Sequence, residues 1–159
     1  MFERILVPLD GSELAEQAIP VAREMAAKFG SRLTLLRAIS TREEAFREVV
    51  SEPTATTAPE LTTGAAMNLH EAEAGSARDY LRRIAEGFSG SGIEVETELV
   101  EGSPEWAIKT QAQELNASLI IMASHGRGGL GRLVYGSVAD TILRESHVPV
   151  MLIRVKDKD

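Results

Sequence analysis

The segment ASLIIMASHGRGGLGRLVYGSVADT, residues 117–141, decides the fold, because an apolar run is followed there by a glycine-rich loop and a helix start. The apolar run, 118–122, is too short for a buried helix and is typical of a strand covered on both faces, as in a parallel sheet. Gly136 and Ser137 open the following helix, and Ser137 with Asp140 has the Ser-x-x-acid spacing of a capping box. Free N–H groups and the positive end of the helix dipole favour an anion at such a start, so the segment predicts a phosphate-binding loop.

Strands and helices alternate along the whole chain. Periodic apolar residues predict strands over 4–9, 32–39, 93–100, 118–122 and 150–155, and helices over 14–29, 65–88, 104–115 and 138–145. This order predicts an α/β fold: an open five-stranded parallel sheet with helices on both faces and the Rossmann-like strand order 3-2-1-4-5. In such a sheet, ligands bind beyond the carboxyl ends of the strands where the strand order reverses, which would bring Asp10, Ile39 and Ala123 to one crevice.

Some segments add detail to this pattern. Pro20 lies inside the helical pattern of 14–29, which predicts a kink or a shorter helix. The threonine-rich segment 40–64 contains two prolines and is expected to be a surface insertion with a short helix near 43–50, within a single domain over 1–159. Alternating apolar and acidic residues over 93–100 predict an edge strand. The helix over 65–88 is expected to turn five side chains into the core: Met67, Leu69, Tyr80, Leu81 and Ile84.

Composition excludes several kinds of partner. With 24 acidic and 17 basic residues the net charge is −7, which disfavours nucleic acid and acidic membrane surfaces as partners. The absence of cysteine excludes disulfides and thiolate metal sites and fits a reducing compartment. No apolar run approaches the roughly 20 residues that span a bilayer. We therefore expect a cytoplasmic protein.

Two familiar phosphate motifs do not fit. Residues 126–131 match G-x-G-x-x-G, but the dinucleotide fingerprint requires an acidic residue at the end of the next strand, and none ends 150–155. A P-loop is also absent from the sequence, because no Gly-Lys-Ser or Gly-Lys-Thr occurs in it.

A longer pattern remains: Ala123-Ser-His-Gly126, nine residues, then Gly136-Ser137. It resembles the G-2x-G-9x-G-S/T signature of the universal stress protein family, in its ATP-binding branch. The segments ERILVPLDGSELAEQA (3–18) and GSVADTILRESHVPVMLIR (136–154) extend the resemblance over essentially the whole chain. One departure is Ala123 in place of the first glycine, whose methyl group would crowd a phosphate unless the φ of this residue is negative.

The resemblance implies ATP as the ligand, with Mg²⁺ or Mn²⁺, in a homodimer formed through the last strand, Val150–Val155, and a role in stress response. It implies that Gly126, Gly136 and Ser137 hold the phosphates, and that Asp10, beside Pro8, meets the ribose or the divalent ion. It further implies that Ala38, Ile39 and Met122 line the adenine. The complete expected site consists of Pro8, Asp10, Ala38, Ile39, Met122, Ala123, Gly126, Arg127, Gly136 and Ser137.

The residues leave alternatives open. Asp10 and Glu13 have the spacing of a helix cap and its box partner, and Arg127 either neutralises a phosphate or is merely solvated. His125 has no acidic partner by spacing. The favoured function is a regulatory protein that binds ATP. The alternatives are a dimeric interaction protein that binds no nucleotide and a slow ATPase, for which the sequence offers no activated nucleophile, loop lysine or clear base.

Overall fold

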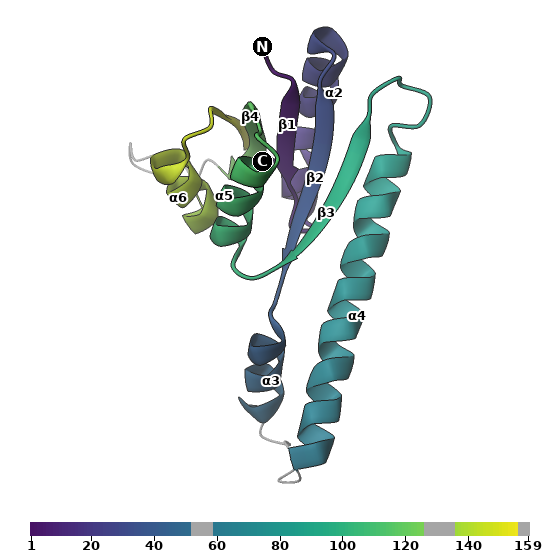
Figure 1. The fold of residues 1–159 in the computed structure, drawn as a ribbon, viewed down its shortest axis with the longest axis vertical. Coiled ribbons are helices and arrows are strands. Elements are labelled where there is room, and N and C mark those ends of the chain that lie inside the picture. Colours follow the sequence, from purple (N-terminus) through teal and green to yellow (C-terminus); the bar gives the residue numbers. More distant parts are fainter. Residues whose placement is uncertain (52–58, 126–135, 156–159) are drawn as a thin grey trace.

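The computed structural model describes residues 1–51, 59–125 and 136–155 of the 159-residue chain (Figure 1). In chain order the elements are β1 (Arg4–Pro8), α1 (Glu13–Glu16), α2 (Ala18–Phe29), β2 (Arg32–Ile39), α3 (Arg42–Ser51), α4 (Pro59–Glu86), β3 (Val95–Glu101), α5 (Pro104–Glu114), β4 (Leu119–His125), α6 (Ser137–Glu145) and β5 (Val150–Val155).

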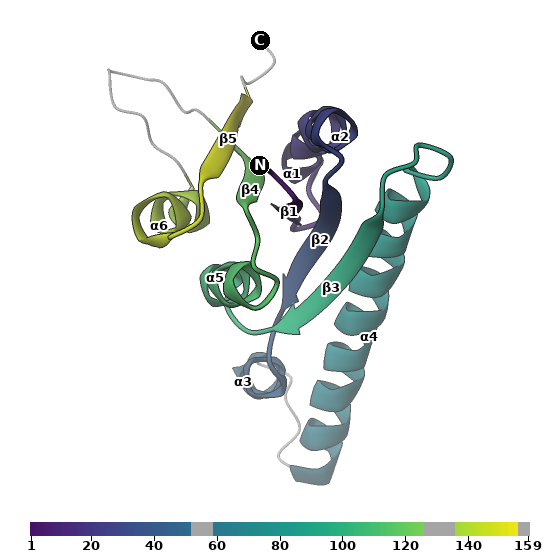
Figure 2. The ribbon, with the colours of Figure 1, turned by 45° about the horizontal axis from the view of Figure 1, so that its top comes forward.

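The five strands form one parallel sheet in the order β3-β2-β1-β4-β5 (Figure 2). The predicted α/β fold and its strand order 3-2-1-4-5 are therefore confirmed. β3 lies at one edge, as its alternating sequence predicts, and β5 lies at the other. The order reverses at β1, whose neighbours are β2 and β4. Ligands bind at such a reversal in open α/β sheets.

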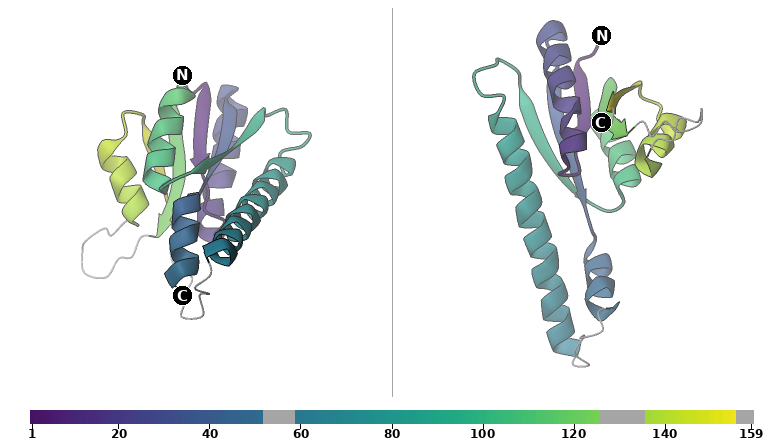
Figure 3. Two further views of the ribbon diagram at one scale, coloured as in Figure 1. Left: turned by 60° about the horizontal axis from the view of Figure 1, so that its bottom comes forward. Right: turned by 180° about the vertical axis from the view of Figure 1, so that it is seen from behind.

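Helices cover both faces of the sheet (Figures 2 and 3). Alternate residues of each strand point to opposite faces, so β1 contributes Ile5 and Val7 to one core and Leu6 to the other. The first core includes residues of α1, α2 and α4, and the second includes residues of α5 and α6. The second core, which holds Ile108 of α5 and Ile142 of α6, packs these two helices against the same face of the sheet.

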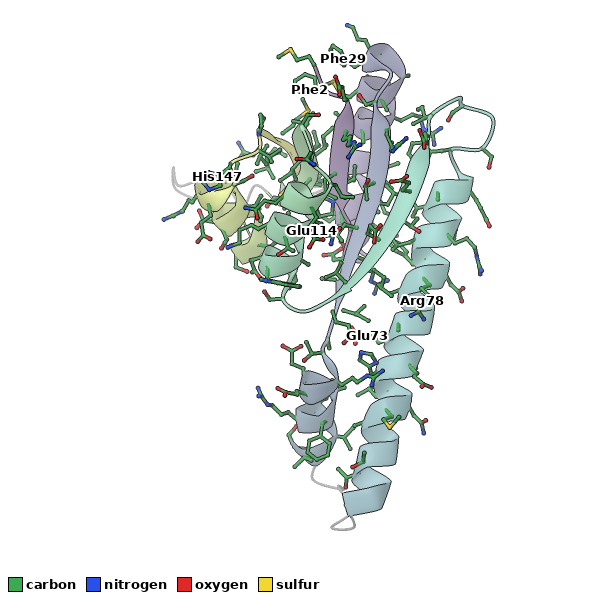
Figure 4. All side chains as sticks on the ribbon, in the orientation of Figure 1. Phe2, Phe29, Glu73, Arg78, Glu114 and His147 are labelled. Atoms are coloured by element: carbon green, nitrogen blue, oxygen red, sulfur yellow. The ribbon has the colours of Figure 1, made fainter. Side chains whose placement is uncertain are left out.

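The helix predicted over 14–29 is two helices. α1 ends at Glu16 and α2 begins at Ala18, with Gln17 between them. Pro20 explains the break, since it has no N–H to donate to the carbonyl of Glu16 and sits comfortably in the first turn of a new helix. Phe29, at the end of α2, is packed edge to face on Phe2, with ring centroids 5.3 Å apart at the amino end of the sheet (Figure 4).

The predicted insertion, 40–64, contains α3 and the first turns of α4, and the two helices lie side by side and project beyond the sheet (Figures 1 and 3). A capping box starts α3: the Glu44 carboxylate accepts from the Thr41 N–H at 2.7 Å, and Thr41 Oγ1 accepts from the Glu44 N–H at 3.3 Å. The Glu44 pKa is lowered, first of all by its hydrogen bonds to Thr41. At the root of the pair, Glu73 Oε1 of α4 accepts from the Ser40 N–H at 3.3 Å (Figure 4).

The long helix α4 has two kinds of surface. Tyr80 and Leu81 are buried against the sheet, as predicted. Met67 and Leu69 are 50% and 37% exposed, so their assignment to the core is wrong. In this part of α4 the helix faces α3 instead of the sheet, and its buried side chains there include Ala66. Within the described ranges, no helix combines the length and the apolar character needed to cross a bilayer.

Candidate functional site

A pocket of about 480 Å³ opens at the carboxyl ends of β1, β2 and β4. The ladder between β1 and β4 ends at Leu6 and Ile120 although both strands continue, so the two strands separate at this edge of the sheet. The start of α6 and one side of α5 supply further walls. The residues that line the pocket are Pro8, Leu9, Asp10, Leu14, Ala15, Leu36, Ala38, Pro104, Ile108, Met122, Ala123, Ser124, Gly136, Ser137, Val138 and Ala139.

Helix α6 presents its amino terminus to this pocket. Gly136 is the N-cap, with φ −60° and ψ 154°, and offers no side chain to the helix. The first intrahelical bond runs from the Asp140 N–H to the Gly136 carbonyl at 2.9 Å. Among the described residues, the N–H groups of Ser137, Val138 and Ala139 have no acceptor. These groups and the helix dipole make the wall at α6 attractive to an anion.

The capping box predicted from Ser137 and Asp140 is not formed. Ser137 is already the first helical residue, because Gly136 takes the N-cap position. The Asp140 side chain instead pairs with Arg144, one turn later, at 3.1 Å. The helix start was therefore displaced by one residue in the sequence interpretation, and the amides are left without a side-chain cap.

Ser124 anchors this helix start and was missed by sequence reasoning. Its side chain is 5% exposed, and its Oγ accepts the Gly136 N–H at 3.2 Å. Strand alternation could have identified it, since Ile120, Met122 and Ser124 occupy alternate positions of β4 and the first two face α5 and α6. A Cβ on Gly136 would meet no described atom within 4 Å, so packing does not require glycine there.

Asp10 follows β1 and stands on a tight turn. Its Oδ1 accepts from the Ser12 N–H at 2.9 Å and from the Ser12 hydroxyl at 2.5 Å. Ser12, and not Asp10, is the N-cap of α1, with its Oγ accepting from the Ala15 N–H at 3.1 Å. The alternative that Asp10 and Glu13 form the capping box is therefore wrong. Within the described residues, Asp10 Oδ2 has no partner, and Asp10 lines the pocket.

The strand ends supply a mainly apolar wall. Ala38 of β2 and Met122 of β4 line the pocket. Ile39, the next residue of β2, is buried against Ala74 and Ala77 of α4, on the opposite face of the strand. The pocket thus brings Asp10 and Ala123 together as expected from the reversal of strand order, but the Ile39 side chain is not part of its lining.

Ala123 fits its position without backbone strain. It lies in β4 opposite Ile153 of β5. Asn116 is the one non-glycine residue with a positive φ in the part of the chain that the structure describes. The condition set by the sequence, that a methyl group requires a negative φ here, is met. Two expected site residues, Gly126 and Arg127, lie outside the described residues.

Titratable side chains are few among the described residues around the pocket. Their lining includes one carboxylate, on Asp10, and no lysine or histidine. In the described ranges, no group of three or more histidine or acidic side chains is placed to hold a metal ion. Any divalent ion at Asp10 would need oxygens from a ligand and from water, which is how Mg²⁺ commonly binds with nucleotides.

Comparison with known proteins gives one consistent family. A sequence model described as the universal stress protein family matches residues 1–154. Universal stress protein MJ0531 of Methanocaldococcus jannaschii is 26% identical, over 100% of this chain and 86% of that protein. The solved structure of MJ0577 has a TM-score of 0.73 at 26% identity and covers 99% of both chains; universal stress protein MJ0577 is from the same organism.

A more distant structure, of a universal stress protein in complex with cAMP, has a TM-score of 0.64 at 21% identity and covers 96% of this chain and 97% of the other. At this identity it shows that the fold is shared. The match of the family over nearly the whole length, together with the strand order, settles the classification. This chain belongs to the universal stress protein family.

Proposed function

We propose that this chain binds an adenine nucleotide, ATP, in the pocket at the carboxyl edge of the sheet, and acts as a nucleotide-dependent regulator in stress response. One observation carries the proposal: the uncapped amino terminus of α6 and the carboxylate of Asp10 line one pocket, whose other lining residues are mostly apolar. A phosphate suits the amides, a base suits the apolar strand ends, and the volume of about 480 Å³ is typical of a small-molecule site.

The chemistry assigns a role to each part of the pocket. The amides of Ser137 to Ala139, with Gly136 adding no side chain beside them, hold the phosphates. Gly126 and Arg127 are proposed to take part in holding them. Ala38 and Met122 contact the adenine ring, and Pro8 shapes the wall beside them. The Ile39 side chain takes no part, because it faces α4.

Asp10 provides the polar end of the ribose subsite. Its free Oδ2 accepts a ribose hydroxyl or supplies one oxygen to a Mg²⁺ or Mn²⁺ ion held by the phosphates. Such an ion, when bound, neutralises phosphate charge. The described lining lacks a lysine, a histidine or a second carboxylate that could activate water, which favours binding over turnover. The cAMP bound by the distant relative carries the adenine, ribose and phosphate groups assigned here.

The test is whether purified protein retains and recognises the nucleotide. Protein expressed without added nucleotide is denatured, and the supernatant is separated on an anion-exchange column, where an adenine nucleotide is expected. Mg-ATP at about 100 times its dissociation constant should raise the free energy of unfolding by about 2.7 kcal/mol. GTP at the same concentration should have a smaller effect, since the apolar wall has been assigned to adenine. A protein that releases no nucleotide and shows no stabilisation by Mg-ATP would contradict the proposal.

We also propose a homodimer through β5. This strand pairs with β4 on one side, and its other edge pairs with no strand among the described residues. Its apolar residues, among them Met151 and Ile153, remain partly exposed, and an apolar open edge is normally covered. Sedimentation at micromolar concentration should therefore give twice the mass of the chain, and Ile153→Lys should give the monomer. A wild-type monomer at that concentration would refute the dimer without touching the nucleotide site.

A further inference from the structure

Arg37 lies directly behind the turn that carries Asp10. We propose that Arg37 is a positioning residue of the pocket: its guanidinium holds the turn of residues 10–12 in place so that Asp10 presents its free oxygen to the ligand. The part of this proposal that concerns the ligand of Asp10 rests on the proposed function. The part that concerns how Arg37 holds the turn is independent of it.

Strand alternation places the Arg37 side chain on the face of β2 opposite to the pocket. Its neighbours in β2, Leu36 and Ala38, both line the pocket, so the Arg37 side chain extends from the other face of the strand. β1 pairs with this part of β2 up to Pro8 and Leu36, and the Leu9 N–H continues the contact by donating to the Leu36 carbonyl at 2.8 Å. The chain then turns at Asp10, beside Arg37.

The guanidinium lies flat against Gly11. A Cβ at residue 11 would be 3.3 Å from Arg37 Nη1, which is tighter than most contacts of a Cβ, and 3.4 Å from both Cζ and Nη2, which is the lower limit of ordinary contact. Gly11 also has φ +88°, in the left-handed region that favours glycine. The backbone of the turn therefore favours glycine, and a side chain at residue 11 would in addition displace the guanidinium of Arg37.

A second contact fixes the guanidinium itself. Arg37 Cζ is 5.2 Å from the centroid of the Tyr80 ring of α4, within cation–π range. Burial raises the pKa of Tyr80 to about 12, with Glu16 and Asp10 adding to the rise and Arg37 opposing it. Tyr80 therefore stays neutral at physiological pH. It interacts with Arg37 through the face of its ring and does not neutralise the charge of the guanidinium.

Arg37 has no acidic partner of its own. Among the described residues, its five N–H donors meet no hydrogen-bond acceptor, and no carboxylate lies within 4 Å. A partly buried guanidinium is normally paired, so its position behind an acidic turn calls for an explanation. Contact with Gly11, the residue that follows Asp10, provides one.

Arg83 supplies a matched control on the same ring. Its Cζ is 5.3 Å from the Tyr80 centroid, but its Nη2 lies 3.6 Å from Glu16 Oε1, at the far end of α1 from the turn. Arg83 thus shares the chemistry and the ring with Arg37 and lacks the contact with Gly11. Arg37→Met and Arg83→Met each remove one positive charge and change the side-chain volume by the same amount.

The first experiment needs no ligand. The Ser12 N–H donates to Asp10 Oδ1, so its hydrogen exchange in the full chain reports whether Asp10 is in place. Arg37→Met is expected to speed this exchange about fivefold or more through local opening, and Arg83→Met to leave it within twofold. Unchanged exchange in Arg37→Met, or equal acceleration in both variants, overturns the proposal.

The second experiment is a double-mutant cycle on the dissociation constant of Mg-ATP. Arg37→Met should weaken binding about tenfold, as removal of a residue that orients a ligating side chain commonly does. In an Asp10→Asn background the same change should have an effect within twofold, because Arg37 then has no carboxylate to orient. Arg37→Lys keeps the charge and should recover part of the affinity.

The outcomes separate the two proposals. Additive losses in the cycle show that Arg37 acts on the fold at large and overturn the positioning role. Faster exchange of the Ser12 amide in Arg37→Met supports the positioning of the turn. If the wild-type protein binds no nucleotide, the proposed function is refuted, and the result for the turn still stands.

Discussion

Replacing Gly136 with aspartate is expected to stabilise the protein and, in the same variant, to weaken Mg-ATP binding at least about 100-fold, or roughly 2.7 kcal/mol. The N-cap backbone of Gly136, at φ −60° and ψ 154°, already has the extended conformation that capping residues adopt, and a Cβ there meets no described atom within 4 Å. An aspartate can therefore reach the free amides of the first turn. Its cap and its charge at the positive helix end should add about 0.5–1 kcal/mol.

The same carboxylate would occupy the groups proposed to hold a phosphate. The N–H groups of Val138 and Ala139 are the usual targets of an N-cap side chain, and they line the pocket. A fixed negative charge at this point also repels the ligand. Stability and binding should thus move in opposite directions, which is not the pattern of a variant that merely misfolds.

Urea denaturation and calorimetric titration with Mg-ATP measure the two effects. Gly136→Asn is the matched control, since asparagine caps through a neutral oxygen of similar reach. It should gain a few tenths of a kcal/mol and lose about tenfold in affinity, less than the aspartate variant. Wild-type affinity in Gly136→Asp would show that the amides of α6 do not hold the ligand.

The fold was largely predictable because parallel strands leave an unambiguous sequence signal. The largely apolar run of 32–39 identifies β2 at its observed bounds, and the acidic alternation of 93–100 identifies an edge. Helix contacts were less predictable. The apolar period of α4 does not reveal whether a turn packs on the sheet or on α3, so Met67 and Leu69 were assigned to a core that the helix reaches only further along the chain.

The position of the pocket could be predicted from the strand order, but the full set of residues that line it could not. Strand order alone indicates that the ends of β1, β2 and β4 meet, which accounts for Asp10, Ala38 and Met122. Which face of β2 carries the pocket depends on where α6 packs, and no local pattern reports this. Ile39 was therefore included although it faces α4, and Ser124 was overlooked although it holds the start of α6.

Truncating Ile142 to alanine is expected to lower the free energy of unfolding by about 3 kcal/mol, because the side chain is fully buried and the nine-residue helix α6 cannot collapse into the space it leaves. Ile142 packs in one core cluster with Leu6, Ile108 and Ile120, so it fixes α6, whose first amides form the proposed phosphate site, to the sheet. Leu143→Ala is the control on the same helix.

Leu143 is 39% exposed, and its loss should cost less than about 1 kcal/mol. Urea denaturation gives both values, provided the dependence of the free energy on urea concentration keeps its slope. Mg-ATP at about 100 times the dissociation constant measured for Ile142→Ala should return about 2.7 kcal/mol to this variant, because the ligand binds only the folded state. Equal costs for the two truncations would mean that α6 is not seated through Ile142.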